Sequence, residues 1–327
     1  MIARRRLILA MGASVLAIPL RSFGQPQRRI PRIGFLVPET PANEATRMDA
    51  LRAGLREHGY SEGKNVEIVV KSANGSYDRL PALALELVSL KVDLIVAFGT
   101  KAVSAAVLAT STIPIVDPVM GDPVALGLTD SLARPGKNVT GLVQFSPEAG
   151  GKRLEFLKEA VPRVTRVALL INPANLGSAR LLELMGDTAS ALRVELRILE
   201  VRDGGELGKV FETIAQDRLE AIAVSTDTLL RANATEIADR AIKQKVPSTG
   251  ASEFAAAGGL IGYGPDPLSL YRRAAYFVDK ILKGAKPDGL PIERATKFDL
   301  VINLRTARML GLKVPQPLLV RANEVIQ

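Results

Sequence analysis

From about residue 30 onward, two hydrophobic patterns alternate along the chain. Short runs that are apolar on both faces are separated by stretches in which apolar residues recur at helical spacing, as Met48, Leu51 and Leu55 do. Runs of the first kind are typical of parallel strands covered by helices. The runs that predict strands are 33–37, 66–70, 92–97, 113–116 and 139–145, followed by 167–171, 194–201, 221–224 and a strand that begins near 246.

The two groups of runs have similar spacing, and each fits a series of βαβ units. Crossover chirality then predicts two doubly wound parallel sheets, so the expected fold class is α/β. We expect two such lobes joined by a hinge of several chain segments, with passages near Ser146, near 264–265 and near 292–298. A hinge of this kind lets a cleft close on a ligand.

The tail after residue 265 holds too few strands for a third lobe. It has a helix stripe over 270–281, a strand-like run at 300–302, one further helix and an extended segment at 315–317. One strand cannot form a lobe, so the tail is assigned to the first lobe. The predicted organisation is a signal peptide at 1–24, a first lobe at 25–145 plus 265–327 that partly crosses the hinge, and a second lobe at 146–264.

The N-terminus has the pattern of an export signal. Arg4, Arg5 and Arg6 form a positive start, the run 7–20 is uncharged and mostly apolar, and Ser-Phe-Gly at 22–24 suits a small-x-small cleavage site. The apolar run has 14 residues, against roughly 20 for a membrane-spanning helix. We therefore expect a periplasmic or other extracytoplasmic protein, exported by the general secretory or the twin-arginine route.

Composition narrows the possible chemistry. The 43 Lys and Arg residues against 34 Asp and Glu give a formal charge of +9, but four arginines lie in the first 24 residues. The excess therefore does not indicate a basic groove for nucleic acid. The chain has no Cys and only one His, His58, which leaves little for thiolate, multi-histidine or triad chemistry. We expect no metal, no cofactor, no nucleic-acid partner and no enzymatic activity.

In open α/β sheets, ligands bind beyond the carboxyl ends of the strands. The residues that follow the predicted strands are therefore the candidate ligand-binding residues: Glu39, Thr40, Thr100, Asp122 and Phe145 in the first lobe, and Asn172, Asp227, Ser252, Glu253 and Tyr263 in the second. Each type also has a structural alternative. The Thr and Ser residues suit helix caps, the Asp residues suit turns or caps, Glu39 suits a solvated loop, and Tyr263 suits the core.

Several short stretches, taken together, resemble one protein family. They are RIGFL at 32–36, LREHGY at 55–60, YDRLP at 77–81, GDPV at 121–124, LARPGKNVTG at 132–141, GKRL at 151–154, AGGL at 257–260, YGP at 263–265 and ATKFDLVIN at 295–303. Over nearly all of 30–327, the chain resembles the substrate-binding component of an ABC-type importer, of the tryptophan/tyrosine-type (ABC_sub_bind) family. The resemblance implies a type I periplasmic binding-protein fold with three crossings, capture of a small solute, and delivery to a membrane permease.

The resemblance also implies a first class of ligand. Some members of the family bind aromatic amino acids, so an aromatic or other amino acid is the expected solute. The loop at 38–41, Pro-Glu-Thr-Pro, is bulkier and more acidic than the small, Ser/Gly-rich loop that is usual in the family. This departure leaves the class of ligand open.

For an amino acid ligand, the strand-end residues suggest individual roles. We expect the ligand carboxylate at Thr100 and its helix N-terminus, the ammonium at Asp227 or Asp122, and an aromatic ring against Tyr263 or Phe145. The protein is expected to act as a monomer that closes about its hinge. A ligand-sensing domain for a membrane receptor and a cofactor-free isomerase or racemase are the alternatives.

Overall fold

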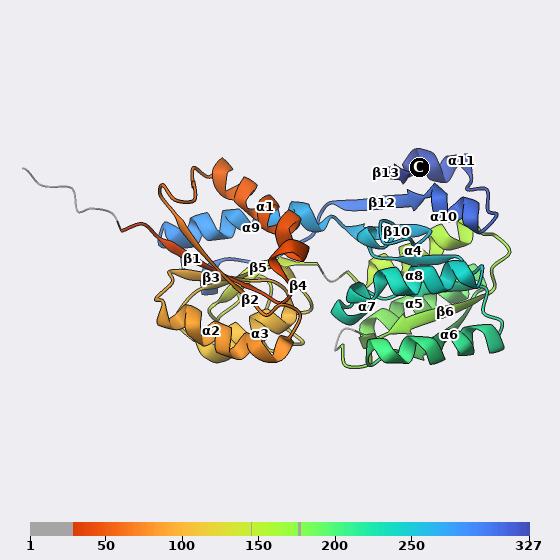
Figure 1. The fold of residues 1–327 in the computed structure, drawn as a ribbon, viewed down its shortest axis with the longest axis horizontal. Coiled ribbons are helices and arrows are strands. Elements are labelled where there is room, and N and C mark those ends of the chain that lie inside the picture. The colour runs from red at the N-terminus through yellow and green to blue at the C-terminus, as the bar shows by residue number, and fades with distance from the viewer. Residues whose placement is uncertain (1–28, 145, 176–177) are drawn as a thin grey trace, which may run out of the picture. The chain divides into compact units, whose positions relative to one another are not determined.

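Two mainly parallel sheets organise the chain in the computed structural model, which describes residues 29–144, 146–175 and 178–327 (Figure 1). The first sheet has six strands, in the order β11 (Glu293–Arg294), β5 (Val139–Val143), β4 (Ile115–Met120), β3 (Leu94–Ala97), β1 (Arg32–Val37) and β2 (Glu67–Ser72). The second has seven, in the order β13 (Glu324–Ile326), β12 (Phe298–Asn303), β10 (Ile261–Pro265), β9 (Ser248–Gly250), β8 (Ala221–Val224), β6 (Arg166–Ile171) and β7 (Glu195–Glu200). Within these two sheets every strand pair is parallel apart from β10 with β12. The predicted α/β class with two doubly wound lobes is confirmed.

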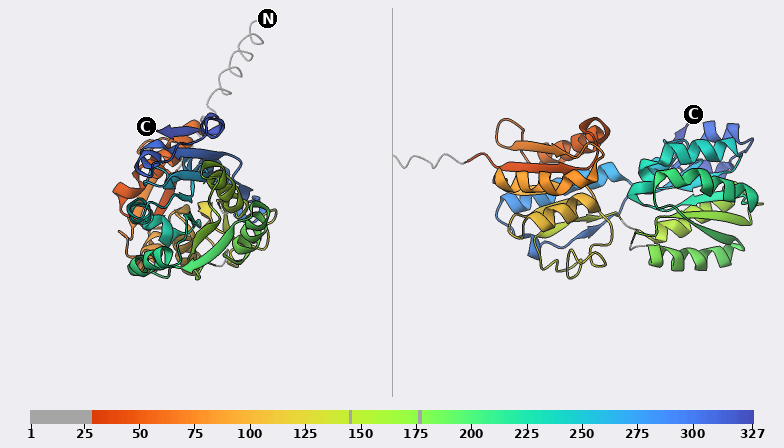
Figure 2. Two further views of the ribbon diagram at one scale, coloured as in Figure 1. Left: turned by 90° about the vertical axis from the view of Figure 1, so that its right-hand side faces the viewer. Right: turned by 60° about the horizontal axis from the view of Figure 1, so that its bottom comes forward.

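Helices cover both faces of the first sheet (Figures 1 and 2). They are α1 (Pro41–Glu57) and α9 (Pro267–Leu282) on one face, and α2 (Leu80–Ser89) and α3 (Thr100–Ala109) on the other. Alternate residues of β1 supply the two cores: Ile33, Phe35 and Val37 pack under α1 and α9, whereas Leu36 packs under α2 and α3. Because both faces of the strand are buried, its sequence reads as a continuous apolar run.

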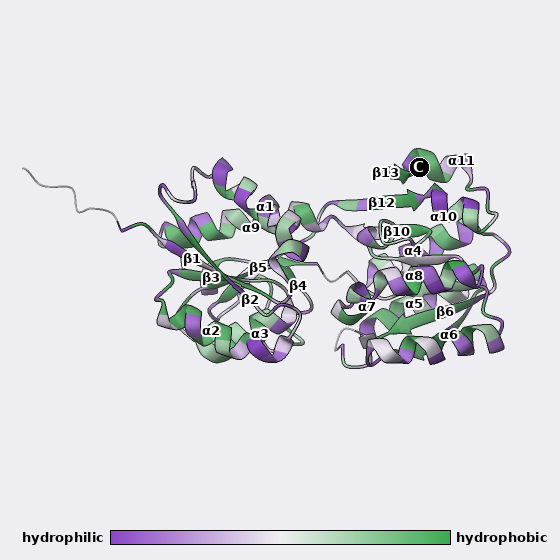
Figure 3. Ribbon diagram, in the orientation of Figure 1, coloured by the Kyte–Doolittle hydropathy of each residue, from purple (hydrophilic) through white to green (hydrophobic). Residues whose placement is uncertain are grey.

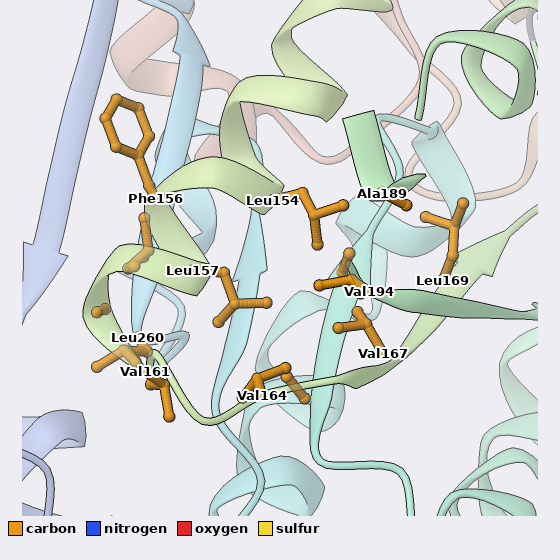
Figure 4. Packing of buried hydrophobic residues seen from close by; sticks show 14 of the residues in the cluster. Leu154, Phe156, Leu157, Val161, Val164, Val167, Leu169, Ala189, Val194 and Leu260 are labelled. Atoms are coloured by element: carbon orange, nitrogen blue, oxygen red, sulfur yellow. The ribbon is translucent and has the colours of Figure 1, made fainter. Parts of the chain in front are cut away.

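The second sheet is covered in the same way. Its helices are α4 (Glu148–Ala160), α5 (Ser178–Leu192), α10 (Leu304–Met309) and α11 (Gln316–Arg321) on one face, and α6 (Leu207–Gln216), α7 (Thr228–Ala232) and α8 (Ala234–Lys243) on the other. Figure 4 shows Leu154 and Leu157 of α4 among the apolar side chains that line the first of these cores. In Figure 3 the strands are mainly hydrophobic, and the polar residues gather on the helices.

The C-terminal tail divides between the two lobes, which corrects its predicted assignment to the first lobe. α9 and β11 do belong to the first lobe, but β12 pairs with β10 and β13 pairs with β12, so the segment from 298 onward completes the second sheet. Leu300 and Ile302 are buried in the core of that lobe. Hydrophobic pattern identifies a strand but does not say which sheet edge the strand joins. The predicted extended segment at 315–317 instead leads into α11, which carries Pro317 in its first turn.

The chain passes between the two sheets three times. The passages lie between β5 and α4, between β10 and α9, and between β11 and β12, beside the three places where the sequence predicts crossings. The predicted signal peptide at 1–24 and the candidate residue Phe145 lie outside the described residues. In the part of the chain that the structure describes, no helix is both long enough and apolar enough to span a membrane.

Candidate functional site

In the first lobe, the predicted residues after β1 take part in local structure. Thr40 is the N-cap of α1, where its hydroxyl accepts a hydrogen bond from Asn43 N at 3.3 Å. Glu39 accepts one from the Tyr77 hydroxyl at 3.2 Å. Burial raises the pKa of Tyr77, and the neighbouring Glu39 raises it further. The Glu39 side chain is therefore held at the strand end by a tyrosine.

The residues after β3 and β4 shape two turns. Thr100 is the first residue of α3, and the N-cap is Gly99, whose φ of 81° is a conformation that favours glycine. Asp122 accepts hydrogen bonds from Val124 N at 3.1 Å and Ala125 N at 3.0 Å, which is an Asx turn. The structural alternative for Asp122 thus describes its observed contacts.

In the second lobe, Asp227 and Asn172 lie together. Asp227 is the N-cap of α7 and accepts hydrogen bonds from Leu229 N at 2.8 Å, Asn172 Nδ2 at 3.1 Å and Asn175 Nδ2 at 2.9 Å. A carboxylate has about four acceptor sites. Most of the acceptor capacity of Asp227 is therefore used within the protein.

Ser252 and Tyr263 are held inside the second lobe. The buried Ser252 hydroxyl donates to Pro265 O at 3.0 Å. The Tyr263 ring lies edge-on to Phe156 with 5.1 Å between ring centroids, and stacks on Phe298 with 5.8 Å between centroids. Both residues therefore fix the region where β10 leaves the second sheet.

Glu253, in the short 3-10 turn Ser252–Phe254, connects the two lobes. Its carboxylate lies 3.1 Å from Arg47 Nη2 of α1 and 3.8 Å from Arg231 Nε of α7. Arg47 also contacts the buried Glu44 at 3.2 Å. Burial alone would lower the pKa of Arg47, but Glu253, Tyr271 and Glu44 together raise it. The bridge between Arg47 and Glu253 brings the carboxyl edges of the two sheets face to face.

Two tyrosines of the first lobe extend this charged region. Tyr271 of α9 is buried, and its pKa is raised by burial and by the charges of Glu44 and Asp117, while Arg47 and Arg231 act in the opposite direction. The pKa of Tyr77 is likewise lowered by Arg231 and raised by Asp227, both of the second lobe, in addition to the larger effects of burial and Glu39. Acidic and basic groups from both lobes therefore surround the same space.

Asp117 is a buried acid with an unused oxygen. It lies on β4 and is fully buried; its Oδ1 accepts hydrogen bonds from Val119 N at 2.8 Å and Gly99 N at 3.4 Å, and its Oδ2 has no hydrogen-bond partner. Burial raises the pKa of Asp117 from 3.8 to about 7, against the smaller lowering effect of the two backbone donors. An ionised carboxylate in such a place needs a cation beside it.

Arg153 is the corresponding buried base of the second lobe. It is 3% exposed, and it donates from Nε to Tyr263 O at 2.6 Å and from Nη2 to Thr226 Oγ1 at 2.9 Å. Burial lowers its pKa to about 10. None of the ion pairs formed between described residues includes Arg153.

Neither Asp117 nor Arg153 is among the residues predicted from the sequence. Asp117 directly follows the predicted run 113–116, but the strand continues to Met120 in the structure, so Asp117 lies inside β4. Arg153 lies inside a helix, where the strand-end rule does not look. The available signal is a charge within an apolar pattern: Asp117 interrupts a strand-like run, and Arg153 shares a buried helix face with Leu154 and Leu157. Arg47, Arg231 and Tyr271 carry no such signal, because their roles come from the packing of distant segments.

Other features lie away from this region. A hollow of about 370 Å³ is lined by residues that precede β6, β8 and β9, including Arg163, Glu220 and Lys245, so it lies at the opposite edge of the second sheet. His58 is the C-cap of α1, with Nδ1 3.9 Å from Asp279 Oδ2. Among the described residues, no group of three or more His, Cys, Asp or Glu side chains could hold a metal ion.

Two doubly wound lobes with three connecting segments and facing charged edges define a two-lobed solute-binding protein. Residues 36–326 match the family model described as ABC transporter substrate binding protein, and the chain belongs to this family. It is the substrate-binding component of an ABC transporter, as the sequence resemblance implied.

Relatives and solved structures agree with this assignment. A curated tyrosine-binding protein of Clostridioides difficile is 25% identical over 276 residues, which cover 84% of this chain and 79% of the relative. The crystal structure of a conserved domain protein from Vibrio cholerae is 30% identical with a TM-score of 0.82, over 91% of this chain and 100% of that chain. An ABC domain from Streptococcus pneumoniae in complex with L-Trp is 24% identical with a TM-score of 0.83, over 90% of this chain and 99% of that chain. The type I periplasmic binding-protein fold is confirmed.

Proposed function

We propose that this protein captures an α-amino acid, with an aromatic side chain, between the facing edges of its two sheets and delivers it to an ABC permease. The membership of the family supplies the transport role. One similar protein is named a tyrosine-binding protein, and the solved structure of another is a complex with L-Trp, which supports an aromatic amino acid as the ligand. The facing edges carry charges of both signs, as recognition of a zwitterion requires.

The observation that carries the proposal is the unused carboxylate oxygen of Asp117. This oxygen is buried without a hydrogen-bond partner, and a ligand ammonium would supply both a hydrogen bond and the missing positive charge. Asp122 and Asp227 already accept hydrogen bonds from caps and turns. Asp117 is therefore a better receptor for the ammonium than either of the two acids that the sequence suggested.

Aromatic rings border Asp117. Phe98 directly precedes Gly99, whose backbone N–H donates to Asp117. The ring of Phe98 meets that of Tyr271 edge-on, with 4.8 Å between the centroids. Aromatic rings favour such edge-to-face contacts with one another, which supports an aromatic ligand side chain in this part of the site.

The remaining parts of the proposal concern location and action. Residues 1–24 would export the chain, and the protein would work outside the cytoplasm as a monomer. It would bind its ligand without chemical conversion, because its buried charges are suited to holding a zwitterion. Thr100, Glu39 and Tyr77 would line the first-lobe side of the site, and Glu253 and Arg231 the second-lobe side.

Isothermal titration calorimetry tests the proposal directly. The purified protein is unfolded and refolded to release any ligand carried through purification, then titrated with L-tryptophan, L-tyrosine, L-phenylalanine, L-leucine, L-glutamate and a neutral sugar. We expect the aromatic amino acids to bind most tightly. Asp117→Asn should weaken this binding by at least about tenfold, whereas Asp49→Asn, a matched change at an exposed helix position, should leave it unchanged. Absence of heat with every amino acid would overturn the proposal.

A further inference from the structure

The guanidinium of Arg153 lies at the carboxyl edge of the second sheet. It reaches there from α4 and bridges two strands, through Tyr263 O within β10 and Thr226 Oγ1 just beyond the end of β8. A Cβ atom at Gly264 would lie 3.2 Å from Arg153 Nη2, so the strand passes close beside the charge. Glu253, which pairs with Arg47 of the first lobe and with Arg231 of α7, comes from the same edge.

This buried charge lacks an acidic partner among the described residues. The two acids nearest along the chain to its contacts are occupied: Asp227 caps α7 and holds two asparagines, and Glu253 pairs with Arg47 and Arg231. An arginine has five N–H donors, and the contacts of Arg153 use two of them. The side chain therefore keeps donors and positive charge for a group that the protein does not provide.

We infer that Arg153 binds the carboxylate of the captured solute. The planar guanidinium presents paired N–H donors that match a carboxylate in geometry and charge. This inference rests on the proposed function, because it takes the ligand to be an amino acid. Together with Asp117 of the first lobe, it assigns the two ends of a zwitterion to opposite lobes, so that the ligand itself links them.

The N-terminus of α3, which the sequence suggested for the ligand carboxylate, is less suitable. The backbone N–H of Gly99, the N-cap of that helix, already donates to the carboxylate of Asp117. A second carboxylate placed at the same helix end would lie close to a like charge, which disfavours it. In the second lobe, Arg153 instead offers the ligand carboxylate a positive charge.

The test compares ligands with and without a carboxylate. L-tryptophan and L-tryptophanamide have the same ring and amino group, but the amide carries no negative charge. We expect the wild-type protein to bind the acid at least about 100-fold more tightly, because a buried charge pair is lost with the amide. Arg153→Gln should lower affinity for the acid by about the same factor and leave affinity for the amide within about threefold. The affinity of Arg153→Lys for the acid should lie between those of the wild type and Arg153→Gln, because lysine keeps the positive charge but lacks the paired N–H donors of the guanidinium.

Controls separate a binding role from a structural one. Arg240→Gln removes an exposed cation of α8 that already has an acidic partner in Glu236, and it should keep the preference for the acid. Equal losses for acid and amide in Arg153→Gln would assign Arg153 a structural role and overturn the inference. If the Arg153 variants do not fold, the wild-type protein still decides, because equal binding of acid and amide contradicts a carboxylate subsite.

The outcomes also separate this inference from the proposed function. Tight binding of L-tryptophan by Arg153→Gln would overturn the subsite and leave amino acid capture standing. If no amino acid binds, the proposed function fails. The wild-type protein and Arg153→Gln are then titrated with a panel of simple carboxylates, and loss of binding in the variant alone would uphold Arg153 as a carboxylate receptor, whereas equal binding by both would overturn it.

Discussion

In the ligand-free protein, the stability of Asp117→Asn relative to wild type should be greater at alkaline pH than at acid pH. Asp117 is fully buried, and burial raises its pKa from 3.8 to about 7. Between these values the folded state holds a proton that the unfolded state has released, so the stability of the wild-type protein falls as pH rises through this window. The asparagine side chain would keep an oxygen to accept from Val119 N and Gly99 N and would never ionise.

The magnitude follows from the pKa of Asp117. Each pH unit in this window contributes about 1.36 kcal/mol. From pH 5 to the folded-state pKa of about 7, wild type should lose about 2–3 kcal/mol relative to Asp117→Asn. Above pH 7 Asp117 is ionised in both the folded and the unfolded wild-type protein, so the stability difference between wild type and variant stays constant. Any cost of burying the new amide group is the same at each pH, so it does not affect this change.

Urea unfolding at pH 5 and pH 8 measures the effect. The free energies of unfolding of wild type and Asp117→Asn are compared at each pH, with Asp49→Asn as the exposed control. Other titrating groups contribute equally to both proteins and cancel in the difference. A wild-type-to-variant difference that stays within about 0.5 kcal/mol between the two pH values would refute a buried, unpaired carboxyl at this position.

Three further predictions concern binding and packing. Affinity for an amino acid should fall by up to about tenfold per pH unit below pH 7, because the ammonium binds the ionised form of Asp117. Calorimetry should show no such pH dependence for Asp117→Asn. The same slope in the variant would assign the pH dependence to another group, and the charges that act on the neighbouring Tyr271 are Glu44, Arg47 and Arg231. Glu253→Gln removes the bridge to Arg47 and should weaken ligand binding by about three- to tenfold, mainly through faster release in stopped-flow experiments; equal release rates would show that the bridge does not hold the lobes. Gly54→Ala places a Cβ 2.2 Å from Arg272 O, where α1 and α9 meet, whereas the new Cβ of Gly208→Ala on α6 meets nothing within 4 Å. In thermal unfolding, the first variant should lose about 2 kcal/mol or more of stability, and the second should gain up to about 1 kcal/mol. Similar stability of the two variants would contradict the close contact between the helices.

The sequence predicted the elements well because their signal is local. β1 and β6 appear as apolar runs, since both of their faces are buried. The assignment of β12 failed because a pattern of residues within a strand contains no information about its neighbour, and the return of β12 to β10 depends on the third passage between the lobes.

The candidate site was predicted less completely, for a related reason. Strand-end position selects turn and cap residues as readily as ligand contacts, and Thr40, Asp122 and Asp227 proved to have such structural contacts. The proposed binding charges, Asp117 and Arg153, are distinguished by the absence of an oppositely charged partner among the described residues. This property emerges only when distant segments pack.

The central claim is that an amino acid lies between the lobes with its ammonium on Asp117 and its carboxylate on Arg153. A crystal structure of the refolded protein with L-tryptophan shows both contacts at once. We expect the ammonium nitrogen at about 3 Å from Asp117 Oδ2 and a carboxylate oxygen at a similar distance from a guanidinium nitrogen of Arg153. A ligand that contacts neither side chain, or one bound at the opposite edge of a sheet, would contradict it.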